Sequence, residues 1–238
     1  MSELVLPAKI FEITGDVDVE SILPSLKAFR DEESFETADG KSLTLVTEVL
    51  DVTYESNRAA GFFSRDYVLN RSFRRQVVET TTTEEAPFWI TPHEDRTFLI
   101  VSAPSVARGV KKLLTNAVAN TLSEALYDQV GLIVEAKIPH ETLKVLHESN
   151  PKATSLIWFD QVDIPGVSKL CLAGSGLADT QLYNEYLQHG AIWYVVFEVQ
   201  KRGIVVGITR SCVVTLFSKS STADFIEYLI EDLLPLID

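Results

Sequence analysis

Alternating and helically spaced apolar residues divide the first part of the chain into distinct expected elements. Segment 5–14 predicts a strand. In 19–29 the apolar residues recur at helical spacing, which predicts a helix. The acidic stretch 31–41 predicts a loop. Alternation resumes over 42–55, which predicts a strand with one irregularity near Val49–Leu50.

The middle of the chain has a less regular pattern. Segment 62–83 is rich in β-branched and aromatic residues but also heavily charged, which is typical of one or two exposed strands at a sheet edge. The polar run 80–87 predicts a loop, and 96–103 predicts a short buried strand. Ser105 is then the expected cap of the longest helix, whose apolar stripe runs over 106–126.

After Gly131 the pattern becomes regular and predicts the order β-α-β-β-α-β-β-α. Lys201-Arg202-Gly203 is a strong hairpin signal between the last two strands. Ser221 and Asp224 resemble a capping box at the start of the last helix, and Asp179 is the expected cap of the helix before it. The expected elements are strand 132–138, helix 140–148, strands 154–159 and 167–173, helix 179–188, strands 191–199 and 204–217, and helix 221–234.

Hairpin-linked strands with helices between them favour an α+β fold over a doubly wound parallel sheet. We therefore expect one or more mainly antiparallel sheets with helices packed on one face, arranged as one body or as two related layers or subdomains. Strand 191–199 is apolar on both faces and is expected to be central. The expected domains are an N-terminal α+β region, 1–130, and a C-terminal α+β region, 131–238.

Charge is unevenly distributed along the 238 residues. The net charge is −13, yet segment 58–112 is the one stretch in which basic residues outnumber acidic ones. Such a negative protein repels nucleic acid and anionic lipid as a whole, so any polyanion must be bound locally. No apolar run is long enough to cross a membrane, and the first residues do not resemble a signal peptide. Cys171 and Cys212 lie in apolar runs and are expected to be buried, reduced thiols, which favours a cytoplasmic protein.

Arginines and aromatic residues alternate within the basic segment. Arginine forms a planar fork that binds phosphate or carboxylate with two hydrogen bonds and stacks on rings, so this composition favours a binding surface for a polyanion. The alternative is that the arginines pair with the acidic N-terminal segment of the same chain. The expected binding residues are Arg58, Arg65, Tyr67, Arg71, Phe73, Arg74 and Arg75, with Phe62 and Phe63 beside them and Asp66 as the opposing charge.

A nuclease-like constellation is the second candidate. Glu135-Ala136-Lys137 forms a Glu-x-Lys motif in an apolar strand, with Asp128 upstream. In restriction-like nucleases two carboxylates hold a divalent cation, and the lysine steadies the attacking water or the phosphate. Asp128 lies so close to the motif in sequence that no separate hairpin can present it. A half-buried strand with an alternating polar face is therefore the favoured interpretation.

Two further motifs indicate structure rather than chemistry. His140 and His147 are seven residues apart, roughly 10 Å along a helix axis, which is too far to share a zinc ion. Gly174-Ser175-Gly176 precedes a helix as a phosphate-binding loop does, but Asp179 would repel phosphate and no lysine follows. Neither motif predicts a metal or a cofactor.

Three functions follow from these patterns. The favoured one is a non-enzymatic intracellular binding protein or complex subunit that contacts nucleic acid or an acidic partner protein through the Arg/aromatic segment. The alternatives are a metal-dependent nuclease built on Asp128, Glu135 and Lys137, and a structural protein–protein interaction module. Oligomeric state is left open.

Overall fold

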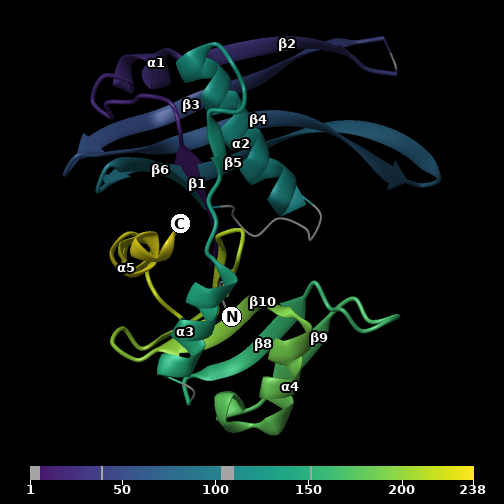
Figure 1. Ribbon diagram of the computed structural model, residues 1–238. Helices are drawn as coiled ribbons and strands as arrows, with labels where there is room; N and C mark the ends of the chain where they lie inside the picture. Colours follow the sequence, from purple (N-terminus) through teal and green to yellow (C-terminus); the bar gives the residue numbers. More distant parts are fainter. Residues whose placement is uncertain (1–5, 39, 103–109, 151) are drawn as a thin grey trace. The chain divides into compact units, whose positions relative to one another are not determined.

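Antiparallel strand pairing dominates the computed structural model, which describes residues 6–38, 40–102, 110–150 and 152–238 (Figure 1). These residues form twelve strands and five α-helices. The α+β class and the mainly antiparallel sheet predicted from the sequence are confirmed. That all helices cover one face stays a prediction.

The chain divides into two compact units. Unit 2 is the continuous segment Phe11–Val134, and unit 1 combines residues 6–10 with Glu135–Asp238. Strand β1 (Leu6–Ile13) contributes residues to both units, and the short strand β7 (Ile133–Glu135) crosses the second boundary.

Unit 2 contains a meander in which each strand pairs with the next along the chain. The strands are β2 (Arg30–Glu36), β3 (Ser42–Glu55), β4 (Arg58–Phe73), β5 (Gln76–His93) and β6 (Arg96–Ser102). A register shift in β3 between Leu50 and Thr53 interrupts its pairing with β4, next to Asp51 with φ of 52°. The irregularity expected near Val49–Leu50 is therefore a β-bulge.

Helices α1 (Leu23–Ala28) and α2 (Val110–Tyr127) share one buried cluster with the strands of unit 2. Leu26 of α1 and Val118 of α2 are fully buried with Phe63 of β4. This apolar cluster fixes the inner ends of β4 and β5, from which the rest of these two strands extends.

Unit 1 is a second set of antiparallel strands, in which β10 is central as predicted. The strands are β8 (Thr154–Asp160), β9 (Leu170–Ala173), β10 (Ala191–Val199), β11 (Ile204–Thr209) and β12 (Val213–Leu216), with residues 6–9 of β1 paired to β12. β10 pairs with β11 on one side and with β8 on the other. The hairpin at Lys201–Gly203 is confirmed, and Gly203 supplies its positive φ of 63°.

The helices of unit 1 are α3 (His140–Ser149), α4 (Gln181–His189) and α5 (Thr222–Tyr228). The predicted capping box of Ser221 and Asp224 is confirmed at α5, which continues as a π-helical turn over Leu229–Leu233. Arg202, in the β10–β11 turn, forms ion pairs with Glu231 and Asp232 and so ties the hairpin to this helical segment.

Three predictions of local structure were wrong for related reasons. Most of the acidic stretch expected as a loop forms β2, and the polar run 80–87 lies within β5, because each pairs along its length with a neighbouring strand. The expected strand 204–217 is two strands, because the backbone turns at Arg210–Cys212. In the first two cases the partner strand, which a local pattern does not show, decided the outcome.

One helix cap and one cysteine also differ from what the sequence predicted. Thr180, not Asp179, caps α4, because the Thr180 hydroxyl accepts a hydrogen bond from the Tyr183 N–H. Cys212 is buried as expected but Cys171 is exposed, so the prediction of two buried thiols was half wrong. Ser105 lies outside the described residues. No helix in the described ranges is long and apolar enough to cross a membrane.

Candidate functional site

The five arginines lie at three places on and just after strand β4. Arg65 and Arg71 lie along the strand, and Arg74 and Arg75 form the turn that follows it. Arg58 begins the strand, roughly 40 Å from Arg71 at the usual rise per residue. Arg58 is therefore separate from the other four.

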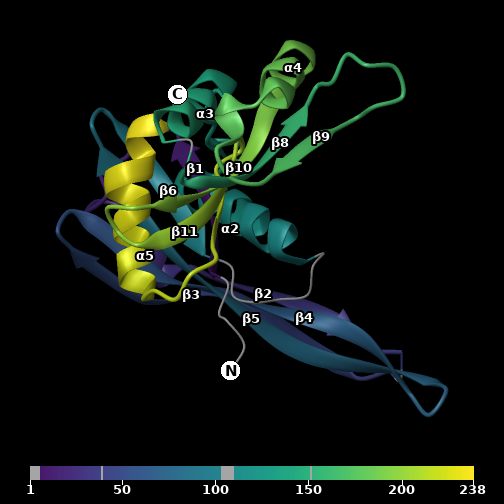
Figure 2. The ribbon, with the colours of Figure 1, turned by 90° about the horizontal axis from the view of Figure 1, so that it is seen from below.

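Beyond its core contacts the β4–β5 hairpin is a two-stranded ribbon. β3 stops pairing with β4 at Thr47, opposite Arg65. In place of the backbone pairing that ends there, the side chain of the next residue, Asp66, accepts hydrogen bonds from Val46 N–H at 3.0 Å and from the Thr83 hydroxyl at 2.6 Å. Residues 66–83 pair only with each other as strands and extend about 25 Å to a turn, which we call the ribbon (Figure 2).

One face of the ribbon continues the core face of the sheet. Side chains alternate along a strand, so Phe63, which is fully buried, shares its face with Tyr67, Leu69, Arg71 and Phe73. Exposure rises outward along this face: Leu69 is 40% exposed and Phe73 is 63% exposed. The ribbon thus presents an apolar face that leaves the core and becomes accessible, with arginine at its outer end.

The turn at the tip of the ribbon has an unusual sequence. Phe73 pairs with Gln76, so Arg74 and Arg75 form a two-residue turn with φ of 49° and 67°. Both values lie in the left-handed region, where a side chain costs roughly 1–2 kcal/mol per residue and Asn-Gly is preferred. The β3–β4 turn follows that preference in part, since Asn57 is one of its two residues.

Arginine and ring contacts occur at both ends of the ribbon. The Arg74 guanidinium lies 5.4 Å from the centre of the Phe73 ring, and that of Arg65 lies 5.5 Å from the Tyr67 ring. Burial raises the pKa of the Tyr67 phenol, which is therefore neutral at physiological pH. Of the other aromatic residues in the segment, Phe63 is core and Phe62 is 39% exposed.

The three outer arginines are available to an external anion. Among the described residues, Arg71, Arg74 and Arg75 form no ion pair, whereas Arg30 and Arg96 each pair with glutamate. The nearby Glu79 carboxylate accepts the Ala38 N–H at 2.8 Å.

A second cation lies near the ribbon. A hollow of about 730 Å³ runs between the β2–β3 turn and β5, and Lys41 and Val77 are among its lining residues. Lys41 belongs to the stretch interpreted as an acidic loop. Its position beside the ribbon follows from strand pairing, which the sequence pattern did not reveal.

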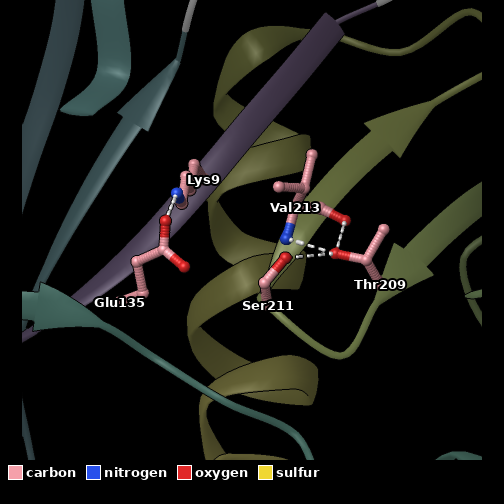
Figure 3. Close-up of polar contacts among 5 residues, drawn as sticks. All are labelled: Lys9, Glu135, Thr209, Ser211 and Val213. Atoms are coloured by element: carbon pink, nitrogen blue, oxygen red, sulfur yellow. Dashed lines mark hydrogen bonds and ion pairs between the residues drawn. The ribbon is translucent and has the colours of Figure 1, made fainter. Parts of the chain in front are cut away.

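Glu135, one of the three nuclease-like residues, has a partner within the chain. Glu135 forms an ion pair with the buried Lys9 of β1, so its carboxylate serves as the counter-charge of that lysine (Figure 3). Asp128 follows α2 in unit 2, whereas Glu135 and Lys137 belong to unit 1. Within the described residues no three His, Cys, Asp or Glu side chains are grouped so that they could hold a metal ion.

No protein-family model matches the chain, and no curated protein sequence matches it.

Proposed function

We propose that unit 2 binds nucleic acid through the tip of the β4–β5 ribbon. The observation that carries the proposal is the exposure of Arg71, Arg74 and Arg75 beside the exposed Phe73 at the end of the ribbon, where none of the three arginines forms an ion pair with a described residue. Guanidinium groups bind phosphate with paired hydrogen bonds, and an exposed phenylalanine ring stacks on bases. A two-stranded ribbon is also narrow enough to enter the major groove of a duplex.

The strained turn supports the same proposal. Two left-handed arginines destabilise the hairpin relative to Asn-Gly, and residues that cost stability in this way are concentrated at functional sites. Their position in the turn puts both cations at the end of the ribbon. Binding in a cytoplasmic setting, as expected from the sequence, stays part of the proposal.

The alternatives have less support. A nuclease centred on Glu135 would need that carboxylate for a metal, but it is paired with Lys9. An acidic protein partner would use the same arginines without base stacking, so it is an outcome of the experiment below. A purely structural interaction module gives no reason for exposed arginines at a strained turn.

The test is a titration of labelled single-stranded and duplex oligonucleotides at several salt concentrations. Arg71→Ala, Arg74→Ala and Arg75→Ala together should weaken binding at least about tenfold. The salt dependence should also become shallower, by about 0.7 in the log–log slope for each phosphate of a single strand that the variant no longer binds. The control is Lys27→Ala, Lys152→Ala and Lys219→Ala, which removes the same charge from exposed positions elsewhere. Chelation of divalent cations should leave binding unchanged.

Two results would reject the proposal. One is the absence of binding at low salt by the unaltered protein. The other is equal weakening in both triple variants, which would show that only net charge matters. Binding to an acidic protein that nucleic acid does not displace would assign the arginines to a protein partner instead.

A further inference from the structure

We propose that a cavity in unit 1 binds a small organic molecule by its phosphate or carboxylate group. The cavity has a volume of about 470 Å³, which lies within the range of small-molecule sites. It is independent of the ribbon, because every residue that lines it belongs to unit 1. The lining residues that matter here are Lys137, His140, Asp160, Trp193, Arg210 and Ser211.

The turn between β11 and β12 presents two of these side chains from a fixed backbone. The Thr209 hydroxyl oxygen accepts the Val213 N–H at 3.0 Å and lies 3.2 Å from the Ser211 hydroxyl (Figure 3). Arg210 N–H donates to the Trp193 carbonyl at 3.0 Å. These bonds hold Arg210 and Ser211 in place before any ligand arrives, which lowers the entropy cost of binding.

Arg210 is held by a carboxylate but keeps hydrogen-bond donors free. Its Nη2 donates to both oxygens of Asp160, at 2.7 and 2.6 Å. Because one nitrogen serves both oxygens, Nη1 has no partner among the described residues, and Nε is buried without one. Nη1 is the donor that Asp160 leaves for a second acceptor, such as an oxyanion, whereas Nε is too buried to reach one.

The start of helix α3 supplies further donors. His140 Nδ1 accepts the Ile192 N–H at 2.9 Å, so the proton of the neutral ring is on Nε2. Glu141 Oε1 lies 3.6 Å from that nitrogen, beyond hydrogen-bond distance. No side chain caps the helix after Pro139, so its first N–H groups and the positive end of its dipole add to the attraction for an anion.

The remaining lining indicates an organic ligand rather than a bare ion. Lys137 is exposed at the cavity and forms no ion pair with any described residue, whereas the two aspartates of the lining, Asp160 and Asp238, equal Lys137 and Arg210 in number, so the lining has no net positive charge. Trp193 provides an apolar wall, and Lys169 lies 4.0 Å from the centre of its ring. An oxyanion at the donors, with the ligand body against Trp193, uses both kinds of surface.

The test uses inorganic phosphate and malonate as probes, with chloride at matched ionic strength as the reference. The protein carries Arg71→Ala, Arg74→Ala and Arg75→Ala, so that the ribbon cannot bind the probe. We expect saturable stabilisation against heat and chemical-shift changes at His140 and Ser211. The probe that binds more tightly identifies the phosphate or the carboxylate as the preferred group.

Two single-residue variants test whether the probe binds in this cavity. Lys137→Ala and Ser211→Ala should each weaken probe binding about tenfold, the usual effect of losing a hydrogen bond to a charged group. Lys152→Ala, which removes an exposed lysine outside the cavity, should leave it unchanged. The proposal is wrong if neither probe stabilises the protein more than chloride does, or if all three variants bind alike.

Discussion

The ammonium group of Lys9 is buried and forms an ion pair with the carboxylate of Glu135. Lys9 is 3% exposed, whereas the Glu135 side chain is 42% exposed. The charge that needs compensation is therefore the lysine, because a buried ammonium group has lost its hydration. This ion pair assigns Glu135 a structural role.

Glu135→Ala should lower the free energy of unfolding by about 1–3 kcal/mol, because it leaves the Lys9 charge with less compensation. The check is urea denaturation followed by circular dichroism. Combining Lys9→Met with Glu135→Ala should recover most of the loss, since a buried apolar side chain needs no counter-charge. Unchanged stability in the single variant would show that the ion pair contributes nothing.

Replacing the ribbon turn should separate stability from binding. Arg74→Asn with Arg75→Gly supplies the preferred sequence for two left-handed residues and should stabilise the hairpin by about 1 kcal/mol or more. Hydrogen exchange of the amides in 66–83 measures this gain. The same change removes two cations, so oligonucleotide affinity should fall. Faster exchange in the variant would contradict our account of the turn.

His147 should make the protein less stable in mild acid. It is 1% exposed, neither ring nitrogen has a hydrogen-bond partner among the described residues, and burial lowers its pKa below the ordinary 6.5. The unfolded chain takes up a proton near pH 6.5 while the folded protein does not, so stability falls as the pH drops below about 6.5 and levels off below the folded-state pKa.

His147→Phe keeps a ring at its edge-on contact with Tyr183 and should remove this part of the pH dependence. The measurement is the free energy of unfolding between pH 7.5 and pH 5 for both proteins. Burial also lowers the pKa of His140, so some dependence should persist in the variant. Identical profiles for the two proteins would show that His147 is protonated as readily when folded as when unfolded.

Gly207→Ala should destabilise unit 1 by about 1–3 kcal/mol, as overpacking does. A Cβ at this position would lie 2.1 Å from the Tyr194 hydroxyl oxygen, so the tyrosine ring has to move. Thermal unfolding provides the comparison, and adding Tyr194→Phe should recover part of the loss. A fully stable Gly207→Ala variant would mean that the ring relocates without cost.

Local signals predicted much of the fold, and pairing between distant residues decided the rest. Gly203 indicated its hairpin because glycine readily takes a positive φ, whereas Arg74–Arg75 gave no such signal for the tighter, two-residue turn of the ribbon. The polar residues of 80–85 resemble a loop in isolation, yet they are strand because β4 lies opposite them.

The candidate sites were predictable to different degrees. The composition of the sequence was enough to indicate the arginines as candidates. Which of them lie on the ribbon, and which lie at the other end of β4 as Arg58 does, depends on where β3 stops pairing with β4. The cavity of unit 1 could not be predicted, because His140, Trp193 and Arg210 are remote in sequence and meet only through the backbone bonds of β10 and the turn.

The division of β1 bears on how the protein is made. Residues 6–9 pair with β12, which comes near the end of the sequence, so a ribosome synthesises one strand of this pair roughly 200 residues before the other, on the order of 10–40 s earlier. Unit 2 is a continuous segment that ends at Val134, so the ribosome finishes synthesising it well before it reaches β12. The growing chain must therefore hold residues 6–9 without their β12 partner, and Lys9 without Glu135, while the middle of the protein is still being translated.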